Sequence, residues 1–182
     1  VNTVLFKANS NYGYPEDPYV VTTNNIPSDI SLSNHVVDEN AANTEIGTFT
    51  TTDLDDPEQT MDYAYSLAAP GENSAFTIDG NTLILIRALN YEAQSSHTIN
   101  VKSDDLSGGS VTKSFMIDVI DVNDPPTGLN LSASTIIENQ EVGKTIGYLS
   151  VEDQDNNDTH NFEFVNDETG KYFYRITNRR KS

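Results

Sequence analysis

The chain has 182 residues, with 28 Asp and Glu against 10 Lys and Arg and a formal net charge of −18 at pH 7. This acidic excess argues against nucleic acid or an anionic membrane as partner, because both favour basic patches. The absence of cysteine excludes disulfides and thiolate metal sites, and no apolar run reaches the roughly 18 residues that suggest a membrane span. Hard cations, which prefer oxygen ligands, remain compatible with this composition.

Residues 1–25 contain two apolar stretches, at 4–8 and 18–21, separated by a segment with Gly, Asn and Pro. The same arrangement occurs later, where residues 99–103 and 115–119 flank a Gly-Gly turn. We therefore expect residues 1–25 to be the last two strands of a preceding, incomplete repeat.

The rest of the sequence matches itself after about a hundred residues, as tandem repeats do. The matched segments are Asn24-Asn25-Ile26-Pro27 with Asn123-Asp124-Pro125-Pro126, Ile46-Gly47 with Ile146-Gly147, Asp53-x-Asp55 with Asp153-x-Asp155, and Tyr63-x-Tyr65 with Phe162-x-Phe164. The sequence thus predicts one complete repeat over residues 26–125. Residues 126–182 are predicted to be the first strands of a following, incomplete repeat.

Within the complete repeat, apolar residues alternate with polar ones around residues 63–67, 83–85, 99–101 and 115–119. This period of two is typical of strands with one buried face. Turn signals such as Asp56-Pro57 and Gly108-Gly109 separate the stretches. Six or seven short strands at this spacing favour an all-β, Greek-key, immunoglobulin-like sandwich. No sustained helical period occurs, and residues 89–94 are expected to form one helical turn at most.

Five acidic motifs follow one another through the repeat. They are Glu39 in Asp-Glu-Asn, Asp53-Leu54-Asp55, Leu89-Asn90-Tyr91-Glu92, Asp105 before Ser107-Gly108-Gly109, and Asp121-Val122-Asn123-Asp124-Pro125-Pro126. In order and spacing they resemble the motifs of cadherin-type repeats, and the amino-acid sequence of the stretch is similar to that of bacterial cadherin-like repeats. The resemblance implies cadherin-type β-sandwiches in tandem, in a secreted or cell-surface extracellular protein without enzymatic activity.

The resemblance also implies Ca²⁺ between consecutive repeats, held by both repeats and their linker. At the main junction the implied ligands are Glu39, Asn90, Glu92, Asp121, Asn123, Asp124, Asp153 and Asp155. At the upstream junction they are Asn24, Asp53, Asp55 and Asp105. Asn90 replaces the usual Asp, and Thr22-Thr23-Asn24-Asn25 lacks both linker aspartates, so we expect the upstream ligands to hold one ion. An Asp-x-Asp alone would be an ordinary turn, and five motifs in register favour calcium.

Two functions stay open at this point. The first is an adhesion or scaffold segment that is rigidified by Ca²⁺ and makes homophilic or other surface-protein contacts. The second is a carbohydrate-binding accessory module of a secreted enzyme, in which Tyr63, Tyr65, Tyr91 and the Tyr12/Tyr14 pair would form a platform for polysaccharide. No catalytic motif includes any of the three histidines, and Asn130 and Asn157 begin glycosylation sequons.

The chain ends allow two interpretations. Residues 1–25 and 126–182 are either parts of a truncated fragment, or they complete one another between copies by strand donation in a head-to-tail filament. The partner of the strand with Phe162 and Phe164 decides between them. A strand from another copy would support donation, and pairing within its own chain would contradict it.

Overall fold

The computed structural model describes residues 3–6, 19–22, 24–156, 158–166 and 172–179. The chain divides into two units, Val1–Asp121 and Val122–Ser182, and each is considered by itself. The described residues form β-strands and one short 3-10 helix, η1 (Asn73–Ala75). None of their helices is long and apolar enough to cross a membrane.

The first unit begins with a hairpin of β1 (Thr3–Phe6) and β2 (Tyr19–Thr22), paired antiparallel. Both strands fall in the two apolar stretches that the sequence predicts to be extended. Their membership of a preceding repeat stays a prediction.

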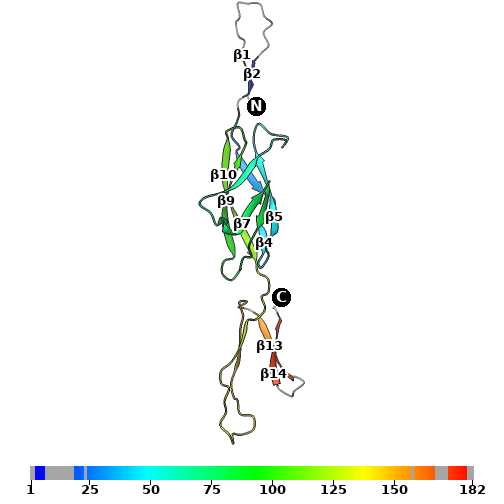
Figure 1. Cartoon of the computed structure of the whole chain (residues 1–182), viewed down its shortest axis with the longest axis vertical. Coiled ribbons are helices and arrows are strands. Elements are labelled where there is room, and N and C mark those ends of the chain that lie inside the picture. Colours follow the sequence, from blue (N-terminus) through cyan, green and yellow to red (C-terminus); the bar gives the residue numbers. More distant parts are fainter. Residues whose placement is uncertain (1–2, 7–18, 23, 157, 167–171, 180–182) are drawn as a thin grey trace, which may run out of the picture. The chain divides into compact units, whose positions relative to one another are not determined.

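Residues 26–121 form two four-stranded sheets (Figure 1). One sheet has the order β4 (Val36–Asp38), β10 (Ser110–Ile120), β9 (Ser96–Asp104), β6 (Ala64–Ala68). The other has the order β3 (Asp29–Leu32), β5 (Thr44–Thr52), β8 (Thr82–Leu85), β7 (Phe76–Asp79). All pairings are antiparallel except that of β4 with β10, which is parallel. The predicted all-β sandwich is confirmed.

Alternate residues of the two sheets form one hydrophobic core. Its buried members are Ile30, Val37, Ile46, Phe49, Ala75, Phe76, Leu83, Leu85, Leu89, Ile99, Val101, Ile117 and Val119. The Phe49 ring lies 5.5 Å from that of Tyr65 and 5.6 Å from that of Phe115, centroid to centroid. Full burial of one such aliphatic or aromatic side chain contributes about 1.5–3 kcal/mol. The period of two in the sequence thus gives both the strands and their buried face.

Three hydroxyl groups in and beside this core pair with one another. The Thr51 hydroxyl is 2.6 Å from the Ser103 hydroxyl and 2.8 Å from the Tyr65 hydroxyl. Because an unpaired buried hydroxyl is costly, this contact fixes β5 of one sheet against β9 and β6 of the other.

The repeated Ile-Gly pair marks a close approach of two backbone segments. The β5–β8 register shifts between Glu45 and Gly47. A Cβ at Gly47 would lie 2.7 Å from the carbonyl oxygen and 2.8 Å from the nitrogen of Asn34. In the second unit, a Cβ at Gly147 would lie 2.8 Å from the carbonyl oxygen of Ala133. Glycine recurs at the two positions because neither leaves room for a side chain.

The second unit contains β11 (Gly128–Leu131) paired with β12 (Leu149–Glu152), and β13 (Thr159–Asn166) paired with β14 (Tyr172–Arg179). Its first strands repeat contacts of the first unit. The Thr48 N–H donates to the Ser33 hydroxyl at 2.8 Å, and the Tyr148 N–H donates to the Ser132 hydroxyl at 2.8 Å. The internal sequence match therefore has a counterpart in backbone geometry.

Among the residues of the second unit whose side chains the structure describes, 122–156 and 158–163, there is no buried hydrophobic core. Ile136 and Ile146 are 51% and 50% exposed, whereas Val37 and Ile46, their matches in the first unit, are 6% and 5% exposed. In the first unit β8, β9 and β10 supply the other half of the core. Residues 122–156 and 158–166 with 172–179 contain no strands matching that half.

Strand donation between copies is not shown by the pairing of β13. Phe162 lies opposite Ile176 of β14 in the same chain, and pairing within its own chain counts against donation. In the first unit the matching strand β6 pairs with β9 instead. The next strand in sequence takes the edge of β13 because a local hairpin closes a short loop at little entropic cost.

We predict that Gly47→Ala destabilises the first unit by about 1–3 kcal/mol, because the added methyl group meets backbone atoms that cannot rotate away. Denaturant unfolding in saturating Ca²⁺ measures this difference. The control is Gly80→Asn, at an open turn whose φ of 58° Asn tolerates, and we expect it to be nearly neutral. Equal stability of Gly47→Ala and the parent chain would show that the close approach relaxes freely.

Candidate metal centres

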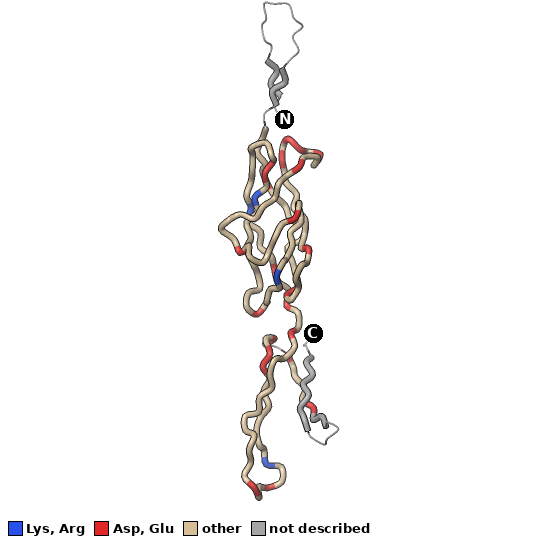
Figure 2. The backbone as a smooth tube through the Cα atoms, in the orientation of Figure 1, with Lys and Arg blue, Asp and Glu red and all other residues tan. Residues whose placement is uncertain are grey.

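Acidic residues are spread over the first unit and basic residues are few (Figure 2). The predicted ligands form three groups: those that follow β4, β8 and β10, those of the second unit, and those near residues 24 and 25.

Glu39 is the buried carboxylate of the first group. It follows β4 directly, is 2% exposed, and its N–H donates to the Ile120 carbonyl at 3.0 Å. Its Oε2 accepts the Tyr91 N–H at 2.9 Å. A buried carboxylate needs such partners or a cation. The loop after β8 thereby holds the Glu39 side chain in one orientation.

That loop is one helical turn, as predicted. The Gln94 N–H donates to the Asn90 carbonyl at 3.0 Å, and the Ala93 N–H donates to Asn90 Oδ1 at 2.6 Å. The Asn40 N–H donates to the carbonyl of the buried Leu89 at 3.1 Å. The Asn90 side chain thus caps the turn that presents Glu92.

Glu92 links the carboxylates at this end of the first unit. Its oxygen lies within 4.8 Å of an oxygen of Glu39, and also within 4.8 Å of one of Asp121. Like charges this close repel one another unless a cation neutralises them. Three predicted ligands, from three separate segments of the sequence, therefore lie together.

In the second unit, the predicted ligands lie in the Asp-x-Asp loop and the linker before it. The Asp124 N–H donates to Asp155 Oδ2 at 2.7 Å, and the Asp155 N–H donates to Asp153 Oδ1 at 3.1 Å. Gln154 Nε2 donates to Asp124 Oδ2 at 3.1 Å. Asn123 Nδ2 donates to the Asp124 carbonyl at 2.9 Å. His160 Nε2 lies 2.7 Å from Asp153 Oδ2, a contact that the sequence did not indicate.

The upstream group repeats this arrangement with amides in place of acids. The Asn25 N–H donates to Asp55 Oδ2 at 2.6 Å, matching the Asp124–Asp155 contact. Asn24 Nδ2 donates to Asp105 Oδ2 at 2.7 Å, and the Ser107 and Gly109 N–H groups donate to Asp105 Oδ1, each at 2.8 Å. Among the described residues, Asp53, Asp55 and Asp105 do not form a trio with all ligand atoms within 4.8 Å.

Hydrogen bonds keep the upstream carboxylates ionised. The N–H and amide groups of Asn25 lower the pKa of Asp55 below its ordinary value. Burial acts to raise the pKa of Asp105, but hydrogen bonds from Asn24, Ser107 and Gly109 outweigh it and the pKa is lowered. Both groups are therefore charged acceptors at neutral pH.

Two residues of this region were missed by the sequence reasoning. Asn25 was passed over although it matches Asp124 in the repeat, which was the available signal. Asp56 was interpreted only as part of an Asp-Pro turn. It is 2% exposed and accepts the N–H groups of Thr60 at 2.6 Å and Met61 at 3.1 Å, and the Tyr63 hydroxyl at 3.3 Å. Asp56 thus orders the loop that follows Asp53 and Asp55.

The donor sets fit calcium. Every predicted ligand offers a carboxylate or amide oxygen, and neither thiolate nor a cluster of imidazoles is involved. Ca²⁺ takes six to eight oxygen ligands in flexible geometry, whereas zinc sites favour His and Cys.

The sequence of the chain is similar to those of known cadherins. Residues 33–120 match the family model of the cadherin domain. The chain is 34% identical over 73 residues to mouse protocadherin Fat 4, covering 39% of this chain and 2% of that protein. It is 30% identical over 117 residues to human protocadherin gamma-A2, covering 62% of this chain and 13% of that protein. The chain therefore spans a small part of these relatives' length.

The fold has matches among solved structures. Human protocadherin-24 EC1–2 aligns with a TM-score of 0.57 and 17% identity, over 78% of this chain and 67% of that one. At this identity the match shows the fold alone. These relatives are mammalian protocadherins, so the finer resemblance to bacterial repeats stays a prediction.

We predict that Asp56→Asn lowers the melting temperature at about pH 7. The gap, that is, the difference in melting temperature between this variant and the parent chain, should shrink as the pH falls below 3.8, the ordinary pKa of an Asp side chain. Burial acts to raise the pKa of Asp56, but hydrogen bonds from Thr60, Met61 and Tyr63 lower it overall. A group with a depressed folded pKa contributes stability above the unfolded value and loses it as the pH falls through the folded one.

Thermal denaturation at several pH values, in the presence of a calcium chelator, measures this gap. Asp62→Asn is the matched control, because it removes the same charge from an exposed position of the same loop. A gap of equal size at every pH would contradict the role assigned to the Asp56 charge.

Proposed function

The chain carries a cadherin domain over residues 33–120, and on this premise we propose that it is an extracellular adhesion or scaffold segment stiffened by Ca²⁺ where its repeats join. Cadherin domains are non-enzymatic extracellular repeats that bind Ca²⁺, and cadherins engage in homophilic contacts. The observation that carries the proposal is that a Glu92 oxygen lies within 4.8 Å of an oxygen of Glu39 and one of Asp121 in the first unit.

The proposed ligands of the main junction come from both units. Glu39, Glu92 and Asp121 would be supplied by the first unit, and Asp124, Asp153 and Asp155 by the second, with Asn123 in the linker and Asn90 capping the Glu92 turn. Bound Ca²⁺ would neutralise these carboxylates and oppose their mutual repulsion. Six carboxylates carry six negative charges, which two or three divalent ions offset in large part.

The upstream site is proposed as the weaker of the two. Asn24 and Asn25 are neutral and already donate hydrogen bonds to Asp105 and Asp55. An amide that donates to a carboxylate occupies an oxygen that a cation would otherwise use. Asp53, Asp55 and Asp105 remain ligand candidates there.

The repeat boundaries follow from the same proposal. Residues 26–125 form the complete repeat, and residues 126–182 carry the first strands of the next one. Residues 1–25 would then supply the last strands of the repeat before. The shared contacts of Gly47 with Asn34 and of Gly147 with Ala133 support this assignment.

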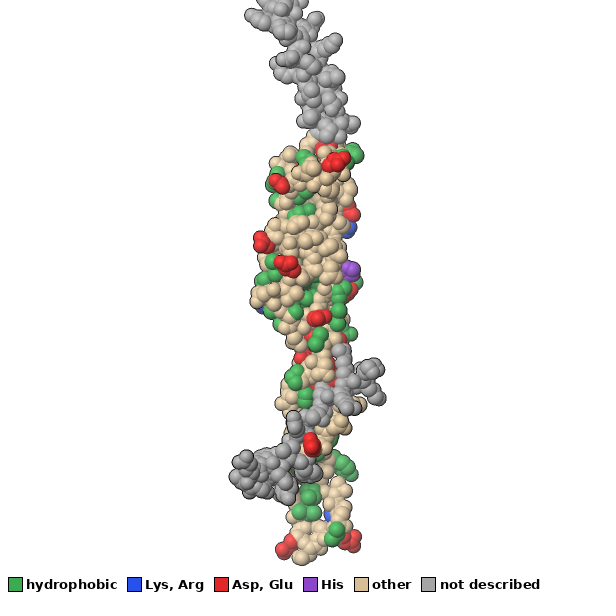
Figure 3. All heavy atoms as spheres, turned by 90° about the vertical axis from the view of Figure 1, so that its right-hand side faces the viewer, with side chains coloured by type: hydrophobic (Ala, Val, Ile, Leu, Met, Phe, Trp, Pro, Cys, Tyr) green, Lys and Arg blue, Asp and Glu red, His purple; other side chains and the backbone are tan. Residues whose placement is uncertain are grey.

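Two tyrosines of the platform in the carbohydrate-binding alternative belong to the sandwich, whereas Tyr91 is exposed and Tyr12 and Tyr14 lie outside the described residues. Tyr65 is half-buried and stacks on Phe49, and the hydroxyl of the half-buried Tyr63 donates to Asp56. On the face of the first unit seen in Figure 3, hydrophobic side chains lie in small groups among polar ones. Tyr63 and Tyr65 therefore stabilise the sandwich, as strand tyrosines commonly do.

We predict that millimolar Ca²⁺ raises the melting temperature of the chain by several degrees over excess chelator. A ligand that binds only the folded state stabilises it by about 2.7 kcal/mol at a hundredfold excess over its Kd. Small-angle scattering should show a narrower distance distribution with Ca²⁺, because shared ligands fix the angle between the units.

The two readouts separate the two parts of the proposal. No melting shift and no heat in a calcium titration would contradict calcium binding itself. A melting shift with identical scattering profiles would mean that the ions stabilise one unit without fixing the linker.

We predict that Glu92→Ala weakens calcium binding roughly tenfold or more, the usual effect of losing one charged interaction. Asp104→Ala is the matched control, since Asp104 pairs with Lys102 at 2.8 Å on β9 and belongs to neither acidic group. Calorimetric titration of both variants measures the difference. Equal calcium affinities of the two variants would show that Glu92 is not a ligand.

A further inference from the structure

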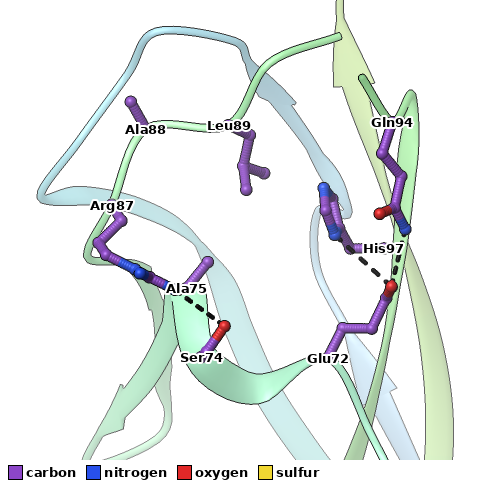
Figure 4. A pocket seen from close by; sticks show the side chains of 8 residues that line it. All are labelled: Glu72, Ser74, Ala75, Arg87, Ala88, Leu89, Gln94 and His97. Carbon is purple, nitrogen blue, oxygen red and sulfur yellow. Dashed lines mark hydrogen bonds and ion pairs between the residues drawn. The ribbon is translucent and has the colours of Figure 1, made fainter. Parts of the chain in front are cut away.

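A cavity of about 450 Å³ opens in the first unit between η1, the segment after β8 and the start of β9 (Figure 4). This volume lies in the range of small-ligand pockets. Arg87 and Ser74 lie on one side, Gln94 and His97 on the other, and Leu89 points into the space between them. None of the groups that line it is a predicted calcium ligand.

Arg87 is an unusual cation in this acidic protein. Among the cations at residues 24–121, Lys102 pairs with Asp104 at 2.8 Å and Lys113 with Asp29 at 2.7 Å. In that range Arg87 is the one without a carboxylate partner, and it donates only to the Ser74 hydroxyl, at 2.8 Å. A guanidinium has five donors and binds carboxylates in a bidentate manner. Most of the donors of Arg87 are therefore available to a ligand.

The opposite wall consists of acceptors held in fixed positions. Glu72 Oε1 accepts from Gln94 Nε2 at 2.8 Å, and Glu72 Oε2 accepts the Thr98 N–H at 2.8 Å. His97 Nδ1 lies 3.5 Å from Glu72 Oε2, and His97 Nε2 is buried without a hydrogen-bond partner. This wall matches a neutral ligand group that carries several hydroxyls.

We propose that this cavity binds a carboxylated sugar, a hexuronic acid unit of an extracellular polysaccharide. The sugar carboxylate would pair with Arg87 beside Ser74, the ring hydroxyls would donate to Glu72, and the apolar ring face would cover Leu89. A phosphate suits the cavity less well, because Glu72 repels a second negative charge. This mode relies on charge pairing and does not need the aromatic platform considered above.

The net charge of −18 opposes an anionic ligand, and two conditions limit that effect. The charges of Arg87 and Glu72 offset one another inside the cavity. Ionic strength of about 0.15 M screens charges farther than about 8 Å. The decisive experiment therefore uses the whole 182-residue chain at this ionic strength with saturating Ca²⁺.

Glucuronate and glucose are titrated separately into the parent chain, Arg87→Gln and Lys102→Gln, and binding is followed by NMR chemical-shift changes. We expect glucuronate to bind the parent chain, and Arg87→Gln to weaken this binding about tenfold or more. Lys102→Gln removes the same charge elsewhere and should leave binding unchanged. Since the Arg87 side chain forms its one described hydrogen bond with Ser74, melting curves should show that Arg87→Gln folds like the parent.

Three results would overturn the proposal. Absence of glucuronate binding to the parent chain would remove the site. An equal loss of glucuronate affinity in Arg87→Gln and Lys102→Gln would mean that the net charge of the chain alone determines binding. Equal binding of glucose and glucuronate would show that the carboxylate is not recognised.

Discussion

Repulsion between carboxylates held at fixed positions is the constraint on which this protein depends. Glu39 is buried after β4, Glu92 lies on a turn capped by Asn90, and Asp121 follows β10, so the fold brings their charges together. A sandwich core could form without these acids, because the core residues are apolar and lie between the sheets. The acids concentrate negative charge on the loops at one end of the unit, and the core holds these loops in place. Stability and the proposed calcium binding therefore reside in different residues of one unit.

The upstream group and the group of the second unit share one backbone geometry and differ in the charge of their linker side chains. In both, a linker N–H donates to the second aspartate of an Asp-x-Asp loop, from Asn25 to Asp55 and from Asp124 to Asp155. Backbone docking of the linker is thus independent of the linker side chain. That side chain sets the local charge, since Asn adds donors and Asp adds an acceptor. Under the proposed calcium binding, a single substitution would change ion affinity while the path of the chain stays the same.

The sequence predicted those features that depend on period and spacing. Alternation of apolar residues located β6, β8, β9 and β10, and the acidic motifs located Glu39, Glu92 and Asp121. Asp56 could not be recognised, because its role rests on two N–H groups and a hydroxyl that the folded loop brings to one carboxylate. The pairing of β13 with β14 was also missed, since the repeat match suggested the neighbour that β6 has in the first unit. Contacts between segments distant in sequence, such as Thr51 with Ser103, follow from packing and leave no local pattern.

The parallel pairing of β4 with β10 has a mechanical consequence. Val36, Val37 and Asp38 lie opposite Asp118, Val119 and Ile120, so the beginning of the domain is bonded to its end. A pull on the two ends of a domain joined in this way acts along both strands in opposite directions. The hydrogen bonds are then loaded in shear and must break together, whereas a hairpin pulled at its open end breaks one bond at a time. The parallel pair of β4 and β10 therefore resists such a pull better than a hairpin would.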